Sequence, residues 1–145
     1  MTVQTPSQPR MAEQLTVRQW LILGLTAAVA AIVGVLIVRA AALAIWPDAA
    51  RFQPLDSVGR ASVFTLVPAL IATGLLAWLT RRTADPAAAF IRISAIVLVL
   101  SFIPDYILPV PNRTVAASTI AAFLHVVAAA IIVPVLVRGY RRMAS

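Results

Sequence analysis

Two side chains could move a proton in an otherwise apolar part of this sequence, Asp105 and His125. A carboxylate and an imidazole that meet inside a membrane can exchange a proton, hold a cation or line a path for a solute. Asp105 belongs to the stretch SFIPDYILPVPNRT, residues 101–114, and His125 is the single histidine of the chain. Each needs a partner or a wet surface, because charge at membrane depth is costly.

Depth counting suggests a partner for Asp105. At 1.5 Å per helical residue, Asp105 lies about 27 Å above the inner end of its segment and Arg39 about 28 Å above the inner end of its own. Both heights fall near the outer boundary of the hydrocarbon. We therefore predict an Arg39–Asp105 ion pair, with Arg113 as the alternative partner. Its simplest role is structural, closing the outer end of the bundle, and a functional site is the alternative.

His125 lies deeper, about 20 Å from the inner end of its segment. It shares a helix face with small residues, Ala117, Ala121 and Ala128, which lets another helix approach closely. A hydrogen bond from His125 to Ser101, to Thr65 or to Asp105 is geometrically reasonable. The simplest interpretation is an interhelical hydrogen bond without chemistry, and a proton-linked or ligand-binding role is the alternative.

Other chemistry has little support in the sequence. The chain has no cysteine, and Glu13 is its only glutamate, so ligands for a metal are scarce. A Gly-rich phosphate loop, paired carboxylates, an HExxH motif and a nucleophile elbow are absent from the sequence. We therefore expect no enzymatic activity, no catalytic residue, no bound metal and no cofactor.

The elements that position these side chains are four apolar runs. Of the 145 residues, 61% are hydrophobic and 12% are charged, far from the balance of a soluble domain. Each run is long enough to cross a hydrocarbon core, which needs about 20 helical residues. Short connections force neighbouring helices to be antiparallel. The sequence predicts an all-α integral membrane protein, an antiparallel bundle of four transmembrane helices at residues 20–46, 61–80, 87–108 and 114–137.

The arginines predict the orientation of this bundle. All twelve basic residues are arginine, against five acidic residues. Seven flank one side of the predicted spans and three flank the other, and cytoplasmic flanks are the richer in Lys and Arg. We expect both termini in the cytoplasm. This distribution also explains the net charge of +7 without a nucleic-acid partner.

The two ends of the chain are polar. Residues 1–19 are expected to form a disordered cytoplasmic segment, residues 20–140 the membrane domain, and residues 141–145 a basic cytoplasmic tail. Cleavage of the first run as a signal peptide is the alternative interpretation. Its apolar core, residues 20–38, is longer than the roughly 7–15 residues of a signal peptide, which favours an anchor.

Three stretches carry a resemblance to a known family. The sequences ALIATGLLAWLTRRT, LVLSFIPDYIL and FLHVVAAAIIVPVLVRGYRR together resemble an uncharacterised bacterial family of four-span membrane proteins, known as a domain of unknown function. On this resemblance, Ser101, Pro104, Asp105 and His125 form the polar signature of the family. The resemblance implies a fold and a membrane location, and it supplies no activity, substrate or cofactor.

These observations favour a structural, accessory or interaction role in the bacterial plasma membrane. The expected partners are the lipid bilayer and either a second copy of the chain or a larger membrane complex. The alternative is a small oligomeric transporter or channel with a proton-linked path past Asp105 and His125. A third hypothesis, an enzyme that acts on lipid, has weaker support because no activated nucleophile accompanies these two residues.

Overall fold

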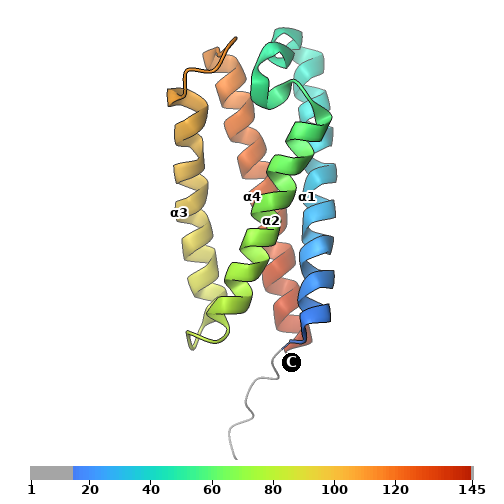
Figure 1. Cartoon of the computed structure of the whole chain (residues 1–145), viewed down its shortest axis with the longest axis vertical. Coiled ribbons are helices and arrows are strands. Elements are labelled where there is room, and N and C mark those ends of the chain that lie inside the picture. Colours follow the sequence, from blue (N-terminus) through green and yellow to red (C-terminus); the bar gives the residue numbers. More distant parts are fainter. Residues whose placement is uncertain (1–14, 145) are drawn as a thin grey trace, which may run out of the picture.

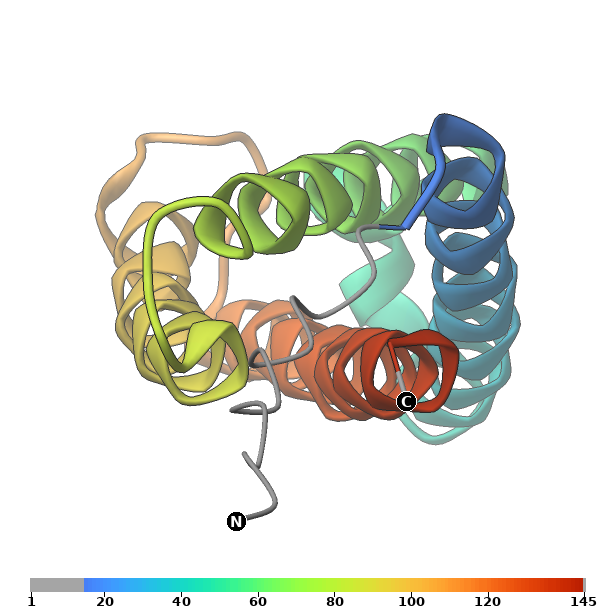
Figure 2. The same cartoon turned by 90° about the horizontal axis from the view of Figure 1, so that it is seen from below.

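The computed structural model describes residues 15–144, which fold into four long helices (Figure 1). They are α1 (Val17–Ile45), α2 (Val58–Leu79), α3 (Pro86–Ile107) and α4 (Val115–Met143). Two 3-10 helices, η1 (Pro47–Arg51) and η2 (Gln53–Leu55), join α1 to α2. Seen from below, the four helices follow one another around a ring, and all four are long and apolar enough to cross a membrane (Figure 2). The predicted antiparallel four-helix bundle is confirmed.

Each helix begins at a residue whose side chain caps it. At α1, the Thr16 hydroxyl accepts the backbone N–H of Gln19 at 3.3 Å, and the Gln19 side chain accepts the backbone N–H of Thr16 at 2.7 Å. The other three helices follow Ser57, Asp85 and Thr114, whose side-chain oxygens accept the backbone N–H three residues ahead. These bonds satisfy donors that a helix leaves unpaired at its start.

The first helix begins earlier than the sequence predicts. The expected disorder of residues 1–19 is wrong for residues 17–19, which form the first turn of α1 because Thr16 and Gln19 make a capping box there. Residues 1–14 of that expected segment lie outside the residues that the structure describes.

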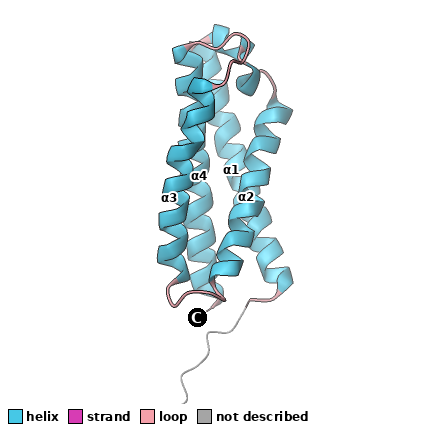
Figure 3. Cartoon of the chain, turned by 60° about the vertical axis from the view of Figure 1, so that its left-hand side comes forward, coloured by secondary structure: helices cyan, strands magenta, loops and turns pink. Residues whose placement is uncertain are grey.

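The two ends of the bundle differ in structure. The end that carries the start of α1, the end of α4 and the turn between α2 and α3 is called the terminal end. The opposite end, the cap end, carries the connection between α3 and α4 and the two 3-10 helices (Figure 3). Residues 46–57 of that end are called the cap. The sequence predicts only a connection there, whereas the chain folds it over the helix ends.

Small residues let the helices approach closely in the terminal half. Ala27, Ala28 and Ala31 of α1 are completely buried. A Cβ atom added to Gly24 would lie 2.8 Å from the Thr73 hydroxyl, so α1 and α2 meet where α1 has no side chain. This core also includes Leu23, Ala69, Leu76, Leu79, Ala87, Phe90, Ile132, Leu136 and Val137.

A second core lies under the cap. Phe52 and Leu55 of the cap are each 1% exposed, and they pack with Ala49 against α1 and α4. The helix residues of this cluster are Val35, Ala117, Ala121 and Leu124. The cap is therefore a packed part of the bundle.

The third helix is held at its two ends. Its buried residues are Ala87 and Phe90 at the terminal end and Asp105 near the cap end, and none of residues 91–104 is buried. Helices α2 and α3 lie close together at the terminal end and diverge toward the cap end (Figures 1 and 3). The candidate site lies in the cap half, where the residues that line it come from both of these helices.

Candidate functional site

Four of the five candidate residues line one pocket. The pocket lies in the cap half of the bundle and has a volume of about 380 Å³, within the roughly 300–1,000 Å³ of ordinary ligand sites. All four helices and the cap contribute to its walls. The four candidates are Thr65 from α2, Ser101 and Asp105 from α3 and His125 from α4. The structure therefore gathers side chains that are up to 60 residues apart in the sequence.

Asp105 and His125 face each other across this pocket wall. The Oδ2 atom of Asp105 lies 3.2 Å from Nδ1 of His125, and the Asp105 side chain is 8% exposed. The predicted contact between these two residues is confirmed. The other predicted partners of His125 are not observed: among the described residues no hydrogen bond joins His125 to Thr65 or Ser101, whose hydroxyls donate to the Ala61 and Leu98 carbonyls. Hydroxyls on membrane helices commonly bond to their own backbone in this way.

The contact between the two residues is close but poorly directed. Nδ1 of His125 also lies 3.0 Å from the carbonyl oxygen of Ala121, which can only accept a hydrogen bond. The same ring nitrogen is thus shared between the Ala121 carbonyl and the Asp105 carboxylate, and its contact with the carboxylate does not have hydrogen-bond geometry. Among the described residues, Oδ2 of Asp105 is buried and has no hydrogen-bond donor. The two residues are thus at ion-pair distance, while the carboxylate oxygen keeps its capacity to accept.

Arg39 does not contact Asp105, and the predicted ion pair is wrong. Its guanidinium donates through Nε, at 3.0 Å, and through Nη2 to the carbonyl oxygen of Leu55 in the cap. The alternative partner, Arg113, donates to the carbonyl oxygen of Tyr106. Both arginines satisfy carbonyls at the ends of short or terminating helices, which have no intrahelical donor. Depth counting along straight helices missed the cap, whose Leu55 carbonyl lies beside Arg39.

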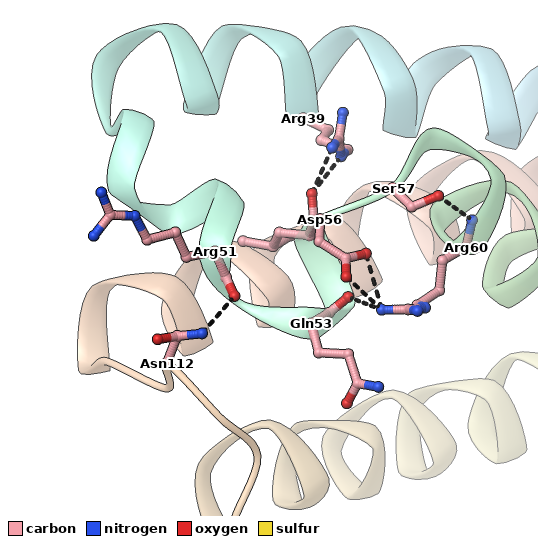
Figure 4. Close-up of polar contacts among 8 residues, drawn as sticks. Arg39, Arg51, Gln53, Asp56, Ser57, Arg60 and Asn112 are labelled. Carbon is pink, nitrogen blue, oxygen red and sulfur yellow. Dashed lines mark hydrogen bonds and ion pairs between the residues drawn. The ribbon is translucent and has the colours of Figure 1, made fainter.

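Three further contacts hold the cap in place (Figure 4). Arg60 of α2 binds the Asp56 carboxylate at 2.8 Å and the Gln53 carbonyl at 2.6 Å. Asn112, in the connection between α3 and α4, donates to the Arg51 carbonyl at 3.2 Å. The cap is therefore joined to α1, to α2 and to the neighbouring connection, and it forms a fixed roof over the pocket.

Ser118 is a site residue that the sequence analysis did not find. Its hydroxyl donates to the backbone carbonyl of Asp105 at 2.6 Å, and its side chain is 1% exposed. In a continuous helix that carbonyl would accept the N–H of residue 109, which is a proline and has none. Pro109, four residues after Asp105, was thus the available signal for an external donor.

The pocket ends at the packed terminal half. Val35 and Ala128 line it, and beyond them toward the terminal end lie Ala31 and Ala69, both completely buried, and the remainder of that core. The residues the structure describes include no group of three or more His, Asp or Glu able to hold a metal ion. The arrangement is a blind pocket with one buried carboxylate and one imidazole in its wall.

Comparison with models of protein families assigns the chain to a family. The model of a family of unknown function, DUF6069, matches residues 11–142. The chain belongs to this family. The match covers α1 to α3 completely and α4 almost to its end, so DUF6069 membership includes the pocket and the cap. The expected resemblance to a four-span family of unknown function is confirmed, and DUF6069 brings no activity with it. No curated protein and no solved structure matches the chain.

Proposed function

We propose that this protein acts in the membrane by binding, and that it holds a small molecule in the pocket beneath the cap. The observation that supports this role is the buried Oδ2 of Asp105, which has no hydrogen-bond donor among the described residues and lies in a mainly apolar wall. A buried acceptor without a donor carries a penalty of about 1–3 kcal/mol, which a ligand that donates to it would remove. This is a specific form of the accessory role expected from the sequence.

A catalytic role has weaker support. A nucleophile activated by His125 would need to lie within hydrogen-bond reach of the imidazole. The hydroxyls of Thr65 and Ser101 donate to carbonyls of their own helices, and that of Ser118 donates to the Asp105 carbonyl. We therefore propose a non-enzymatic protein that requires no cofactor.

Conduction also has weaker support than binding. A channel or transporter needs a path through both halves of the bundle, and alanine and leucine side chains pack the terminal half closely. A transport cycle would have to separate α1 from α4 in that half. The exposed apolar side chains of the four helices fit a lipid bilayer as the principal partner, and a homo-oligomer or larger complex stays a prediction.

For localisation, we propose the bacterial plasma membrane with both termini in the cytoplasm, from the arginine distribution. The chain has no cysteine, so single cysteines report position cleanly. A membrane-impermeant maleimide should label Gln53→Cys, in the cap, on intact cells. Thr83→Cys, in the turn between α2 and α3, should react only after permeabilisation. The reverse pattern would show that the orientation is inverted.

The binding role predicts that small reagents reach the pocket. Thr65→Cys places a thiol in the pocket wall, and Ala69→Cys places one in the terminal core, one turn along the same helix. Methanethiosulfonates react with the thiolate, which needs water. In reconstituted protein we expect Thr65→Cys to react at least about tenfold faster than Ala69→Cys. Equal slow rates would mean that the pocket is closed to solutes and would overturn the proposed function.

A further inference from the structure

We propose that the pocket receives, from the bilayer, a single-chain amphiphile whose head group donates hydrogen bonds, and that Asp105 binds this head group. A primary amine is the best match, and an alcohol shares the same donor chemistry. The proposal rests on the proposed function, since it names the class of ligand for the same pocket. Four features of the pocket lead to it: its opening, its polar groups, the charges around it and its size.

The opening of the pocket faces the lipid. Phe64 of α2 lines it and is 66% exposed, and Leu108, the residue directly after α3, lines it and is 51% exposed. The two helices diverge toward the cap end (Figures 1 and 3). Every other side is covered: Phe52 and Leu55 close the roof, and α1 and α4 pack along each other behind. A ligand therefore enters between α2 and α3, in the cap half of the bundle.

The polar groups of the pocket accept hydrogen bonds and have few hydrogens to donate. Thr65 and Ser101 have already used their hydroxyl hydrogens on backbone carbonyls, so their oxygens can only accept. Oδ2 of Asp105 accepts as well and has no donor among the described residues. Twelve of the sixteen lining residues are apolar. The walls thus suit an apolar body that carries one hydrogen-bond donor.

The charges around the pocket favour the same ligand. The groups that face it are Asp105 from α3 and His125 from α4. The nearest arginine of α1, Arg39, is bound to the Leu55 carbonyl, and Arg60 of α2 is bound to Asp56. Neither arginine lines the pocket, so an anionic head group would meet the Asp105 carboxylate without a guanidinium to compensate. An ammonium group would form a charge-assisted hydrogen bond to that carboxylate.

The volume sets the size of the ligand. The volume of about 380 Å³ lies near the lower end of the range of small-ligand sites. It suits one medium-length alkyl chain with a small head group better than a two-chain lipid. Decylamine, decanol and decanoate are therefore suitable probes, since they share a chain and differ in the head group.

Photolabelling and competition test the proposal on the full-length chain in phosphatidylcholine nanodiscs. The probe is a decylamine that carries a diazirine in its chain. We expect crosslinks in α2 at residues 61–65 and at residues 101–108, which are the last turns of α3 and the residue after it. Decylamine and decanol should displace the probe at membrane concentrations at least about tenfold lower than decanoate, the discrimination that one charged hydrogen bond provides. A stronger effect of decylamine than of decanol identifies charge as part of the recognition, and equal effects identify donation alone.

Two variants separate the head group from the chain. Asp105→Asn should reduce the preference for decylamine over decanoate about tenfold, whereas Asp48→Asn, an equal charge change at an exposed cap residue, should leave it unchanged. Ala61→Leu narrows the pocket and keeps Asp105, so it should weaken all three competitors and preserve their order. Ala61→Leu thus tests the pocket even if Asp105→Asn does not fold.

The proposal is overturned if decanoate competes as well as decylamine, or if crosslinks spread evenly over the exposed face of α3. These failures differ from a failure of the proposed function. When Thr65→Cys reacts rapidly and the head-group preference is absent, the pocket binds something of another class and only this inference is lost. When Thr65→Cys does not react, both this inference and the proposed function are overturned.

Discussion

Replacement of Phe52 by alanine is expected to loosen the cap by about 3–5 kcal/mol, the usual cost of removing a fully buried phenylalanine. Phe52 is 1% exposed and packs in the core under the cap, in a segment that lies outside the four long helices. Its loss therefore combines exposure of apolar surface with a cavity. The amides of Phe52 and Leu55, which bond within the cap, should lose two or more orders of magnitude of hydrogen-exchange protection.

Gln53→Ala is the matched control for this substitution. Gln53 is the next residue and is exposed, and its backbone carbonyl, which binds Arg60, remains in the variant. Protection of the cap amides should change little. If Phe52→Ala left those amides equally protected, the arginine and asparagine contacts alone would hold the cap, and the apolar roof would contribute nothing to its stability.

Phe90→Ala is expected to destabilise the bundle by about 2–3 kcal/mol. Phe90 is completely buried and is one of two buried residues that fix the terminal end of α3. In a bilayer the apolar transfer term is small, because lipid is as apolar as the core, so lost packing dominates. A cavity of roughly 100 Å³ at about 24 cal/mol per Å³ gives this magnitude. Reversible unfolding in mixed micelles, followed by circular dichroism, measures it.

Phe123→Ala supplies the comparison. Phe123 of α4 is 55% exposed, so the same chemical change removes a side chain that contacts lipid and leaves no internal cavity. Its effect should stay within about 0.5 kcal/mol. Equal losses for the two variants would mean that α3 is not anchored through Phe90.

The fold could be predicted because its signals are local. Apolar length defines a membrane helix, and a threonine, serine or aspartate precedes each one. The cap could not be predicted from these signals, since its two turns depend on Phe52 and Leu55 reaching a core formed by distant helices. Arg39 illustrates the error that follows. Height counted along a straight helix does not identify which carbonyl or carboxylate lies beside the side chain.

The site was predictable only in part. Asp105 and His125 could be paired because both are polar, and helix spacing places them about a turn apart in depth. The pocket that they line depends on how far α2 leans away from α3, and tilt is set by packing that the sequence pattern does not express. The lack of a hydrogen-bond donor for Asp105 likewise depends on how the His125 ring lies between Asp105 and the Ala121 carbonyl, which the sequence pattern does not express.

The attachment of α3 by its two ends has a consequence for how this sequence can diverge. Ala87, Phe90 and Asp105 are its buried residues, and residues 91–104 between the two attachments are exposed or half-buried, with Ile93 packed against the terminal core. Where a side chain of α3 contacts lipid, any apolar residue of similar size can replace it. Substitutions at those positions are therefore limited by hydrophobicity rather than by the shape of the side chain. Selection for a particular ligand would therefore act on a few positions along α3, Ser101 and Pro104 among them, while the rest of the helix changes freely around them.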